Sequence, residues 1–305
     1  MSHKLRAWLI VAGVAAVCGA SLWGVAWYRS RSLGTAALLA RLPAENALVA
    51  YIDFSELRRG GVLDLLDGSK AGEDPEYRNF VRQTQFDYKK DLDAAIVAFT
   101  PTGRFLLLKG RFDWKSLRAY VESQSGKCAN AFCRMTGSAP ERRISFFPLR
   151  SNLMALAVSP DESAALRLGN AVPGPDPQLP AAPVWLSIPP SVLRSGDSLP
   201  EGTRMFARGM ERAESATLAF APEGHGLAAR LDVRCRDERD AADLASQLTR
   251  TTSLLRETME RERQKPNPAD LSGVLTSGVF RNEGRRVLGY WPIERAFVEN
   301  VLGGP

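Results

Sequence analysis

The sequence predicts an α+β protein whose body follows an N-terminal transmembrane helix. Three observations carry this prediction: a charge-free apolar run near the start, hairpins with proline and glycine at their turns, and helices after those hairpins. Hairpins require antiparallel pairing, and helices interspersed with them cover a face of the resulting sheet. The order strand, helix, hairpin, helix, hairpin, helix occurs twice, which predicts two related antiparallel-sheet-plus-helix halves.

Residues 7–28 form the predicted transmembrane helix, a run without any charged side chain. At 1.5 Å per residue it is about 33 Å long, enough to cross a hydrocarbon core of roughly 30 Å. Trp8 lies near one end and Trp27 near the other, as interfacial aromatic residues do. A cleaved secretory signal is the alternative, but the apolar run continues into Trp27 and Tyr28, which favours an uncleaved signal anchor. We expect a single-pass protein of the cytoplasmic (inner) membrane, with residues 1–6 in the cytoplasm and the body on the extracytoplasmic side.

The positive charge of the chain belongs mainly to the flanks of this run. The 305-residue chain carries a formal charge of +6. Lys4, Arg6, Arg29 and Arg31 flank the apolar run, and the remainder holds 36 basic and 34 acidic residues. A nearly neutral body lacks the broad positive field that nucleic-acid binding uses. We therefore expect a lipid bilayer and no nucleic acid as a partner.

Prolines divide the body. Residues 29–43 are expected to be a juxtamembrane segment, and residues 44–170 the first α+β half. Residues 171–183 contain five prolines, which neither a helix nor a central strand accepts, and are predicted to be a linker. Residues 184–305 then form the second half.

Two pairs of motifs relate the halves. Residues 52–60 parallel residues 188–196, each strand-like before a serine and helix-like after it. Residues 98–103 parallel residues 219–224, and apolar runs on both sides predict a hairpin in each case. The shared order of these landmarks predicts an internal duplication.

Each half then continues with a helix, a further hairpin and a last helix. The sequence predicts helices over 113–123 and 237–265, with Asp113 and Asp237 as their N-caps. Proline is favoured at the first helical position. We therefore expect the last helices to begin at Pro160 and Pro292. The remaining predicted segments are hairpins over 144–159 and 274–291, and a helical segment over 74–81 in the first half alone.

One stretch resembles a known family. Leu42-Pro43-Ala44, the strand that follows, and Phe86-Asp87-Tyr88-Lys89-Lys90-Asp91-Leu92 before a second strand are similar to the LPA and FDxxxDL elements of uncharacterised bacterial membrane-anchored envelope proteins. The resemblance covers roughly residues 40–170 and implies an envelope location and an α+β domain. The family has no established activity, so no catalytic residue is implied.

The chain holds few residues suited to catalysis. Its two histidines are His3, in the N-terminal tail, and His225, at a predicted hairpin turn, so a histidine-rich metal centre or an ordinary catalytic triad is not expected. Asp87, Asp91 and Asp93 have ligand oxygens but lack the glycine and later glutamate of a calcium loop, which favours helix capping. We expect no catalytic residue, no metal and no cofactor.

Cys128 and Cys133 are candidates for a disulfide. They flank a four-residue turn-like segment, and outside the cytoplasm such a pair can close a small loop. Two free buried thiols are the alternative. Four intervening residues do not fit the two-residue spacing of a thiol redox motif.

Two arginine pairs accompany aromatic strands. Arg142-Arg143 precedes Phe146, and Arg285-Arg286 precedes Tyr290. These arginines are candidates for contact with anionic surfaces, and strand-end arginines on a solvated edge are the competing interpretation.

The anchor and the duplicated body favour a membrane-tethered binding protein that contacts a partner in the envelope, such as an accessory subunit of a membrane complex. One alternative is an extracytoplasmic hydrolase using carboxylates among Asp53, Glu56, Asp64 and Asp67. A carrier of lipids or apolar ligands is the other, and it requires a large apolar cavity. The sequence leaves the oligomeric state open.

Overall fold

The computed structural model of the chain describes most of the body. The described residues are 33–63, 75–137, 139, 141–172, 178–195, 210, 213–224 and 226–303. The predicted transmembrane run 7–28 lies outside them, as do His3, Asp64, Asp67 and His225. Among the residues that are described, no helix is both long enough and apolar enough to cross a membrane.

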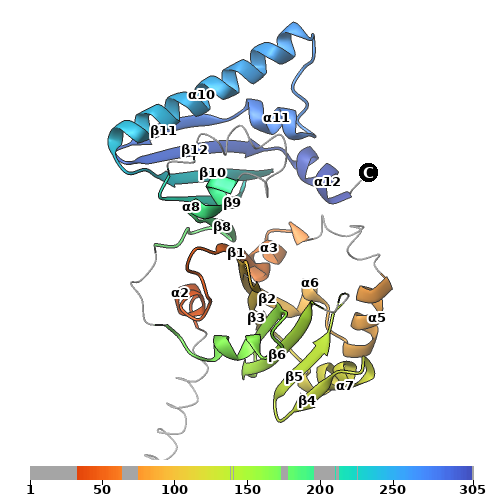
Figure 1. The fold of residues 1–305 in the computed structure, drawn as a ribbon. Coiled ribbons are helices and arrows are strands. Elements are labelled where there is room, and N and C mark those ends of the chain that lie inside the picture. Colours follow the sequence, from red (N-terminus) through yellow and green to blue (C-terminus); the bar gives the residue numbers. More distant parts are fainter. Residues whose placement is uncertain are drawn as a thin grey trace, which may run out of the picture.

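A single antiparallel sheet runs through both halves, which confirms the α+β prediction (Figure 1). Its order is β11-β12-β10-β9-β8-β1-β2-β3-β7-β6-β5-β4. The strands of the first half are β1 (Leu48–Asp53), β2 (Leu92–Thr100), β3 (Gly103–Gly110), β4 (Lys127–Ala129), β5 (Phe132–Thr136), β6 (Arg143–Arg150) and β7 (Leu153–Ser159). Those of the second half are β8 (Val184–Ile188), β9 (Ser215–Glu223), β10 (Gly226–Arg234), β11 (Val279–Glu283) and β12 (Arg286–Ile293).

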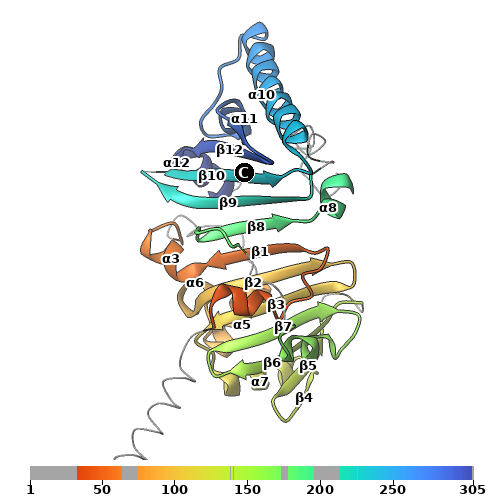
Figure 2. The same cartoon turned by 90° about the vertical axis from the view of Figure 1, so that its left-hand side faces the viewer.

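The two halves meet at strands β1 and β8, which lie side by side in the middle of the sheet (Figure 2). Tyr51 of β1 is paired with Trp185 of β8, and their rings stack with centroids 5.5 Å apart. Trp185 is 2% exposed and belongs to the core of the first half. The second half thus contributes a large apolar side chain to the first, because β-pairing brings the two strands together.

Helices cover the sheet unevenly. We call the side that bears α10 the α10 face, and the other side, which bears α2 and η2, the α2 face. The helices are α2 (Thr35–Leu39), α3 (Phe54–Arg59), α5 (Pro75–Thr84), α6 (Tyr88–Asp91), α7 (Trp114–Ser123), η2 (Ala164–Gly169), α8 (Pro190–Ser195), α10 (Glu238–Arg261), α11 (Leu271–Thr276) and α12 (Arg295–Gly303).

Three apolar cores follow from this arrangement. On the α10 face, α5 and α7 pack on the first half, and α8, α10, α11 and α12 pack on the second. On the α2 face, α2 and η2 pack on the first half around Ile96, Phe105 and Leu107. Leu38 and Leu42, in the segment predicted to be a juxtamembrane connection, are part of that core. Within the described residues, no helix packs on the α2 face of the second half.

Strand order and register repeat between the halves. The order β1-β2-β3-β7-β6 of the first half matches β8-β9-β10-β12-β11 of the second. Ala50 pairs with Val97 in the first half, and Leu186 pairs with Leu218 in the second. The paired residues of the second half follow those of the first by 136 positions in the first strand (Ala50 and Leu186) and by 121 in the next (Val97 and Leu218). The sequence motifs have the same two offsets, 136 from Ile52 to Ile188 and 121 from Ala98 to Ala219. The two sequence motifs therefore align the halves in the same way as the strand pairing does.

Several predicted elements are confirmed. Helix α7 begins after Asp113, whose carboxylate accepts hydrogen bonds from the backbone N–H of Lys115 and Ser116. Helix α10 begins after Asp237, which accepts from Asp240 N–H. The hairpins β2–β3, β9–β10 and β6–β7 and the helical segment now seen as α5 are also present.

Other predicted elements are wrong. The helix expected from Pro160 is the 3-10 helix η2, which begins at Ala164, and the helix expected from Pro292 is α12, which begins at Arg295. Pro292 instead lies in β12, next to Ala228 of β10. The strand expected from Val274 begins at Val279, because residues 271–276 form α11, which Asp270 caps by accepting from Ser272 N–H. By contrast, Cys128 and Cys133 do flank a turn as expected, because they lie on the two strands of the short hairpin β4–β5.

Candidate functional site

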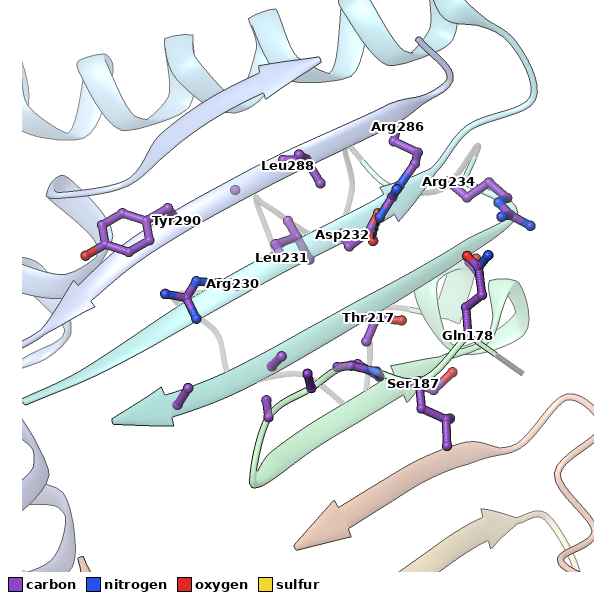
Figure 3. Close-up of a pocket in the computed structure, with 18 of the residues that line it drawn as sticks. Gln178, Ser187, Thr217, Arg230, Leu231, Asp232, Arg234, Arg286, Leu288 and Tyr290 are labelled. Carbon is purple, nitrogen blue, oxygen red and sulfur yellow. Dashed lines mark hydrogen bonds and ion pairs between the residues drawn. The ribbon is translucent and has the colours of Figure 1, made fainter. Parts of the chain in front are cut away.

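A groove lies on the α2 face of the second half, where the described residues place no helix (Figure 3). Its volume is about 1050 Å³, and it is partly open to solvent. Strands β9, β10, β12 and β11 form its floor, and residues 178–182 of the predicted linker line it as well. This groove is the candidate functional site.

Alternation along β10 explains how one strand serves both a core and a groove. Side chains of successive strand residues point to opposite faces of a sheet. Ala229, Leu231 and Val233 are buried in the core under α10, whereas Arg230, Asp232 and Arg234 carry their polar groups on the other face. The strand is therefore apolar toward α10 and charged toward the groove.

The corresponding positions of the first half are apolar and fully buried. Ala98 pairs with Phe105, and its counterpart Ala219 pairs with Arg230. In the same way, Ile96 pairs with Leu107 in the first half, and the corresponding pair of the second half is Thr217 with Asp232. The first-half members of this comparison, Ile96, Ala98, Phe105 and Leu107, have an exposed fraction of 0%. At three of these four positions, a polar side chain thus replaces an apolar one on the face that α2 and η2 leave uncovered.

Ion pairs organise most of the groove. The Arg286 guanidinium contacts the Asp232 carboxylate through two nitrogens, and the hydrogen bond and charge of Asp232 raise the pKa of Arg286. Arg230 Nη2 lies 3.2 Å from Glu223 Oε1, and Tyr290 Oη donates to Glu223 Oε2 at 2.8 Å. That hydrogen bond raises the pKa of the Tyr290 hydroxyl, because the phenol must keep its proton to donate it.

Two further arginines complete the charged lining. Arg281 pairs with Glu283 at 3.0 Å on β11. Arg234 lies directly opposite Arg286 across β10 and β12, and like charges in that position repel. Among the described residues, the Arg234 guanidinium forms no ion pair. Because all these pairs are partly exposed, each contributes little to stability and is open to exchange with a ligand.

The four candidate arginines have different surroundings. Arg143 and Arg134 both pair with Glu162 at one end of β6, and Arg285 pairs with Glu214 at 3.3 Å. Arg143 and Arg286 sit at the ends of β6 and β12, each flanked by strands on both sides, so neither occupies a sheet edge. Of Arg142, Arg143, Arg285 and Arg286, Arg286 alone lines the groove.

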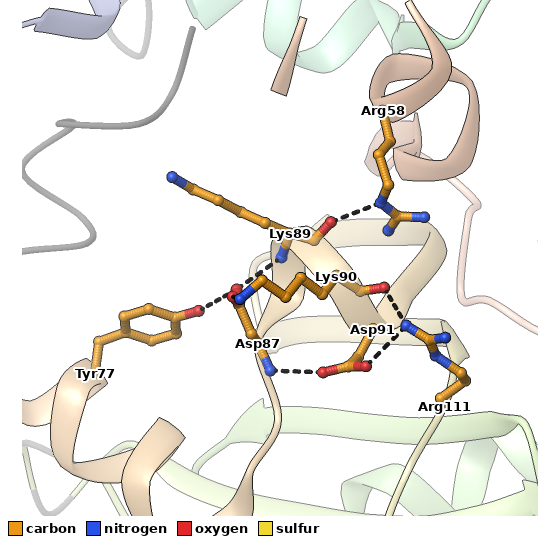
Figure 4. Close-up of polar contacts among 7 residues, drawn as sticks. All are labelled: Arg58, Tyr77, Asp87, Lys89, Lys90, Asp91 and Arg111. Carbon is orange, nitrogen blue, oxygen red and sulfur yellow. Dashed lines mark hydrogen bonds and ion pairs between the residues drawn. The ribbon is translucent and has the colours of Figure 1, made fainter. Parts of the chain in front are cut away.

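The FDxxxDL stretch forms a structural polar cluster (Figure 4). Asp87 caps α6, its carboxylate accepting from Lys89 N–H at 3.1 Å and from Tyr77 Oη at 3.2 Å. Asp91 accepts from Asp87 N–H at 2.9 Å and pairs with Arg111 at 3.1 Å. Burial, with the nearby Asp87 charge, raises the pKa of Tyr77 far above its usual value. These contacts tie α5 and α6 to the sheet and account for Asp87 and Asp91 without a cation.

Other candidate acids have structural contacts too. Asp53 caps α3, accepting from Glu56 N–H at 2.7 Å and from Ser55 Oγ at 2.6 Å. Within the described residues, no group of three or more His, Cys, Asp or Glu side chains is placed to hold a metal ion. The lining of the groove, rich in arginine, does not supply the large apolar cavity that a lipid carrier requires.

Cys128 and Cys133 face each other across the β4–β5 hairpin. The two residues are directly paired in the hairpin, with Cα atoms 4.1 Å apart, and their sulfurs are joined in a disulfide. Cys235, just after β10, is a free buried thiol, and burial raises its pKa. A raised pKa makes this thiol a poor nucleophile at neutral pH.

Sequence reasoning missed most of the groove. It singled out Arg286 but not Arg230, Asp232, Arg234 or Tyr290. The signal was present in the contrast between Gly226–Arg234, where charged residues alternate with apolar ones, and Gly103–Gly110, where Phe105 to Leu108 are all apolar. Alternation predicts a face open to water, and a continuous apolar run predicts burial on both faces.

Comparison with known proteins gives only a weak likeness. No protein-family model matches the chain, and no curated protein sequence does. Among solved structures, crystal form I of TP0453 is 12% identical, with a TM-score of 0.49, over 90% of this chain and 100% of that one. Crystal form III is 11% identical, with a TM-score of 0.48, over 90% and 99%.

Proposed function

We propose that this chain is a membrane-tethered extracytoplasmic binding protein, and that its groove binds a partner protein in the cell envelope. One observation carries the binding part of the proposal. A face whose counterpart in the first half is buried and apolar is here polar and uncovered by any described helix. An open, polar groove suits a segment of another protein better than a small molecule, because small-molecule sites bury most of their ligand.

The two halves then have different tasks. We infer that they arose by duplication, and the matching register of strands β1–β2 and β8–β9 supports this. The first half has helices on both faces and acts as a scaffold. The second half has a helix-covered face that provides its core and a free face that provides the groove.

The membrane tether is the part of the proposal that rests on sequence. The charge-free run 7–28 ends a few residues before Thr35, where α2 begins. An anchor there holds the body close to the bilayer, where partners in the envelope are concentrated. Recovery of the chain in the detergent-soluble membrane fraction, with its N-terminal residues intact, is the expected result. A water-soluble chain lacking residues 1–28 would refute the tether.

Groove-blocking substitutions test the binding part. Thr217→Trp and Leu288→Trp add bulk to the groove floor while leaving the core under α10 untouched. We expect a partner that co-purifies with the wild-type chain in mild detergent to be lost from both variants. Ser246→Trp, on the exposed side of α10, is the matched control and should retain it. Equal recovery of the partner from all four proteins would refute the groove as the binding surface.

A further inference from the structure

The groove also holds evidence about the chemistry of its partner. Its lining includes four arginines and one carboxylate, that of Asp232. Arg286 is paired with Asp232, and Arg230 and Arg281 are paired with Glu223 and Glu283. The fourth, Arg234, has no ion pair within the described residues and lies opposite Arg286. Counted over the described residues, the charge of the groove is therefore unbalanced at one place, and the excess is positive.

Hydrogen-bonding capacity is in excess at the same place. Each guanidinium has five N–H donors, and Asp232 engages Arg286 through two of its nitrogens. Arg234 and Arg286 both line the groove, together with the hydroxyl-bearing residues Ser215 and Thr217 of β9 (Figure 3). Ser215 is paired with Arg234, so its hydroxyl lies on the same row of the sheet. Two adjacent guanidiniums and a hydroxyl are well suited to bind a carboxylate.

We propose that Arg234 and Arg286 form a carboxylate-binding subsite, and that the groove takes an extended acidic segment of a partner protein. This inference rests on the proposed function and adds the class of ligand. A carboxylate between the two guanidiniums relieves their mutual repulsion and provides a counter-charge that no described residue supplies to Arg234. The apolar part of the floor, including Leu288 and Ala219, accommodates the rest of the segment.

Shape favours a protein segment over a bilayer. Lipid headgroups lie in a plane and reach side chains that stand on a flat or convex surface. Arg234 and Arg286 instead belong to the lining of a hollow, of which residues 178–182 form another part. An extended chain enters such a hollow, whereas a bilayer surface meets its rim.

Binding of a labelled oligoglutamate peptide tests the subsite directly. The full chain is held in phosphatidylcholine nanodiscs, and peptide binding is followed by fluorescence anisotropy, with oligoserine as the neutral comparison. We expect oligoglutamate to bind and oligoserine not to bind. Arg234→Gln and Arg286→Gln should each weaken binding about tenfold, the loss of one charge-assisted hydrogen bond. Arg261→Gln, which removes an exposed arginine of α10 paired with Glu257, should leave binding unchanged.

Three other outcomes would overturn the inference, and each points to a different error. Oligoglutamate affinity that is the same in Arg234→Gln, Arg286→Gln and wild type would refute the subsite. If the nanodisc-held chain instead sediments with phosphatidylglycerol vesicles, ignores oligoglutamate and loses the vesicles on Arg234→Gln, the ligand is an anionic bilayer. If oligoglutamate fails while Thr217→Trp still releases a co-purifying partner, the ligand class is wrong and the proposed function stands.

Discussion

At the scale of single residues, serines near three aspartates tune acid stability. Asp113, Asp161 and Asp270 each accept a hydrogen bond from a serine hydroxyl two or three residues later, and this bond is the main cause of their lowered pKa values. A pKa that is lower in the folded state than in the unfolded chain stabilises the fold at pH values above the unfolded pKa. The stabilisation is lost as the pH falls through the folded pKa.

Asp113→Asn tests this effect at the start of α7. The amide retains a capping oxygen but cannot ionise, so the variant should be less stable than wild type at neutral pH. The difference should shrink as the pH falls below about 4, the ordinary range of an aspartate. Chemical denaturation at a series of pH values measures it. Parallel stability curves from neutral pH to about pH 2 would contradict the assigned cause.

At the scale of elements, the face opposite α10 distinguishes the halves. Leu107 and Asp232 occupy matching positions, one buried under α2 and η2 and the other in the groove. Exchanging the side chains, with Leu107→Asp in one variant and Asp232→Leu in another, should therefore lower the free energy of unfolding by unequal amounts.

Leu107→Asp places an unpaired carboxylate in an apolar core and should destabilise the protein by about 3 kcal/mol or more. Asp232→Leu removes one partner of an exposed ion pair and should change stability by about 0.5 kcal/mol or less. Urea unfolding of both variants beside wild type gives the comparison. Similar losses of stability would mean that the groove face is buried against something in the native protein.

The β4–β5 hairpin offers a second test at this scale. Its disulfide closes a loop of only a few residues, so the entropic stabilisation is small. Cys128→Ser combined with Cys133→Ser should lower the free energy of unfolding by about 2 kcal/mol. Intact-protein mass with and without reductant should show one reducible bond in the protein taken from the membrane. Two thiols that alkylate without reductant would contradict the disulfide.

Local signals predicted local elements well. Asp113 and Asp237 marked the starts of α7 and α10 because a capping carboxylate acts on N–H groups two or three residues away. Pro160 and Pro292 misled because proline is accepted at a helix start without requiring one, and Pro292 extends β12 instead. The contact of β1 with β8 joins residues more than a hundred positions apart, which no local pattern encodes. The groove depends on that long-range assembly and on the absence of a covering helix among the described residues, so only one of its arginines was predicted.

At the scale of the whole molecule, one sheet makes the halves interdependent. Trp185 of the second half packs into the core of the first, against Tyr51. Trp185→Ala should destabilise the protein by about 3–5 kcal/mol, the usual cost of deleting a buried aromatic side chain. Because β1 and β8 are joined, fluorescence of the remaining tryptophans and loss of β-structure by circular dichroism should report one shared transition. Separate transitions for the halves would contradict a shared core.

The account depends most on the groove being the surface that meets another protein. Site-specific photo-crosslinking tests this most directly, with the crosslinking residue at Leu288 in the groove or at Glu122 on the exposed side of α7. In native membranes, we predict one discrete heavier adduct from position 288 and none from position 122. An adduct from position 122 without one from position 288 would contradict the account.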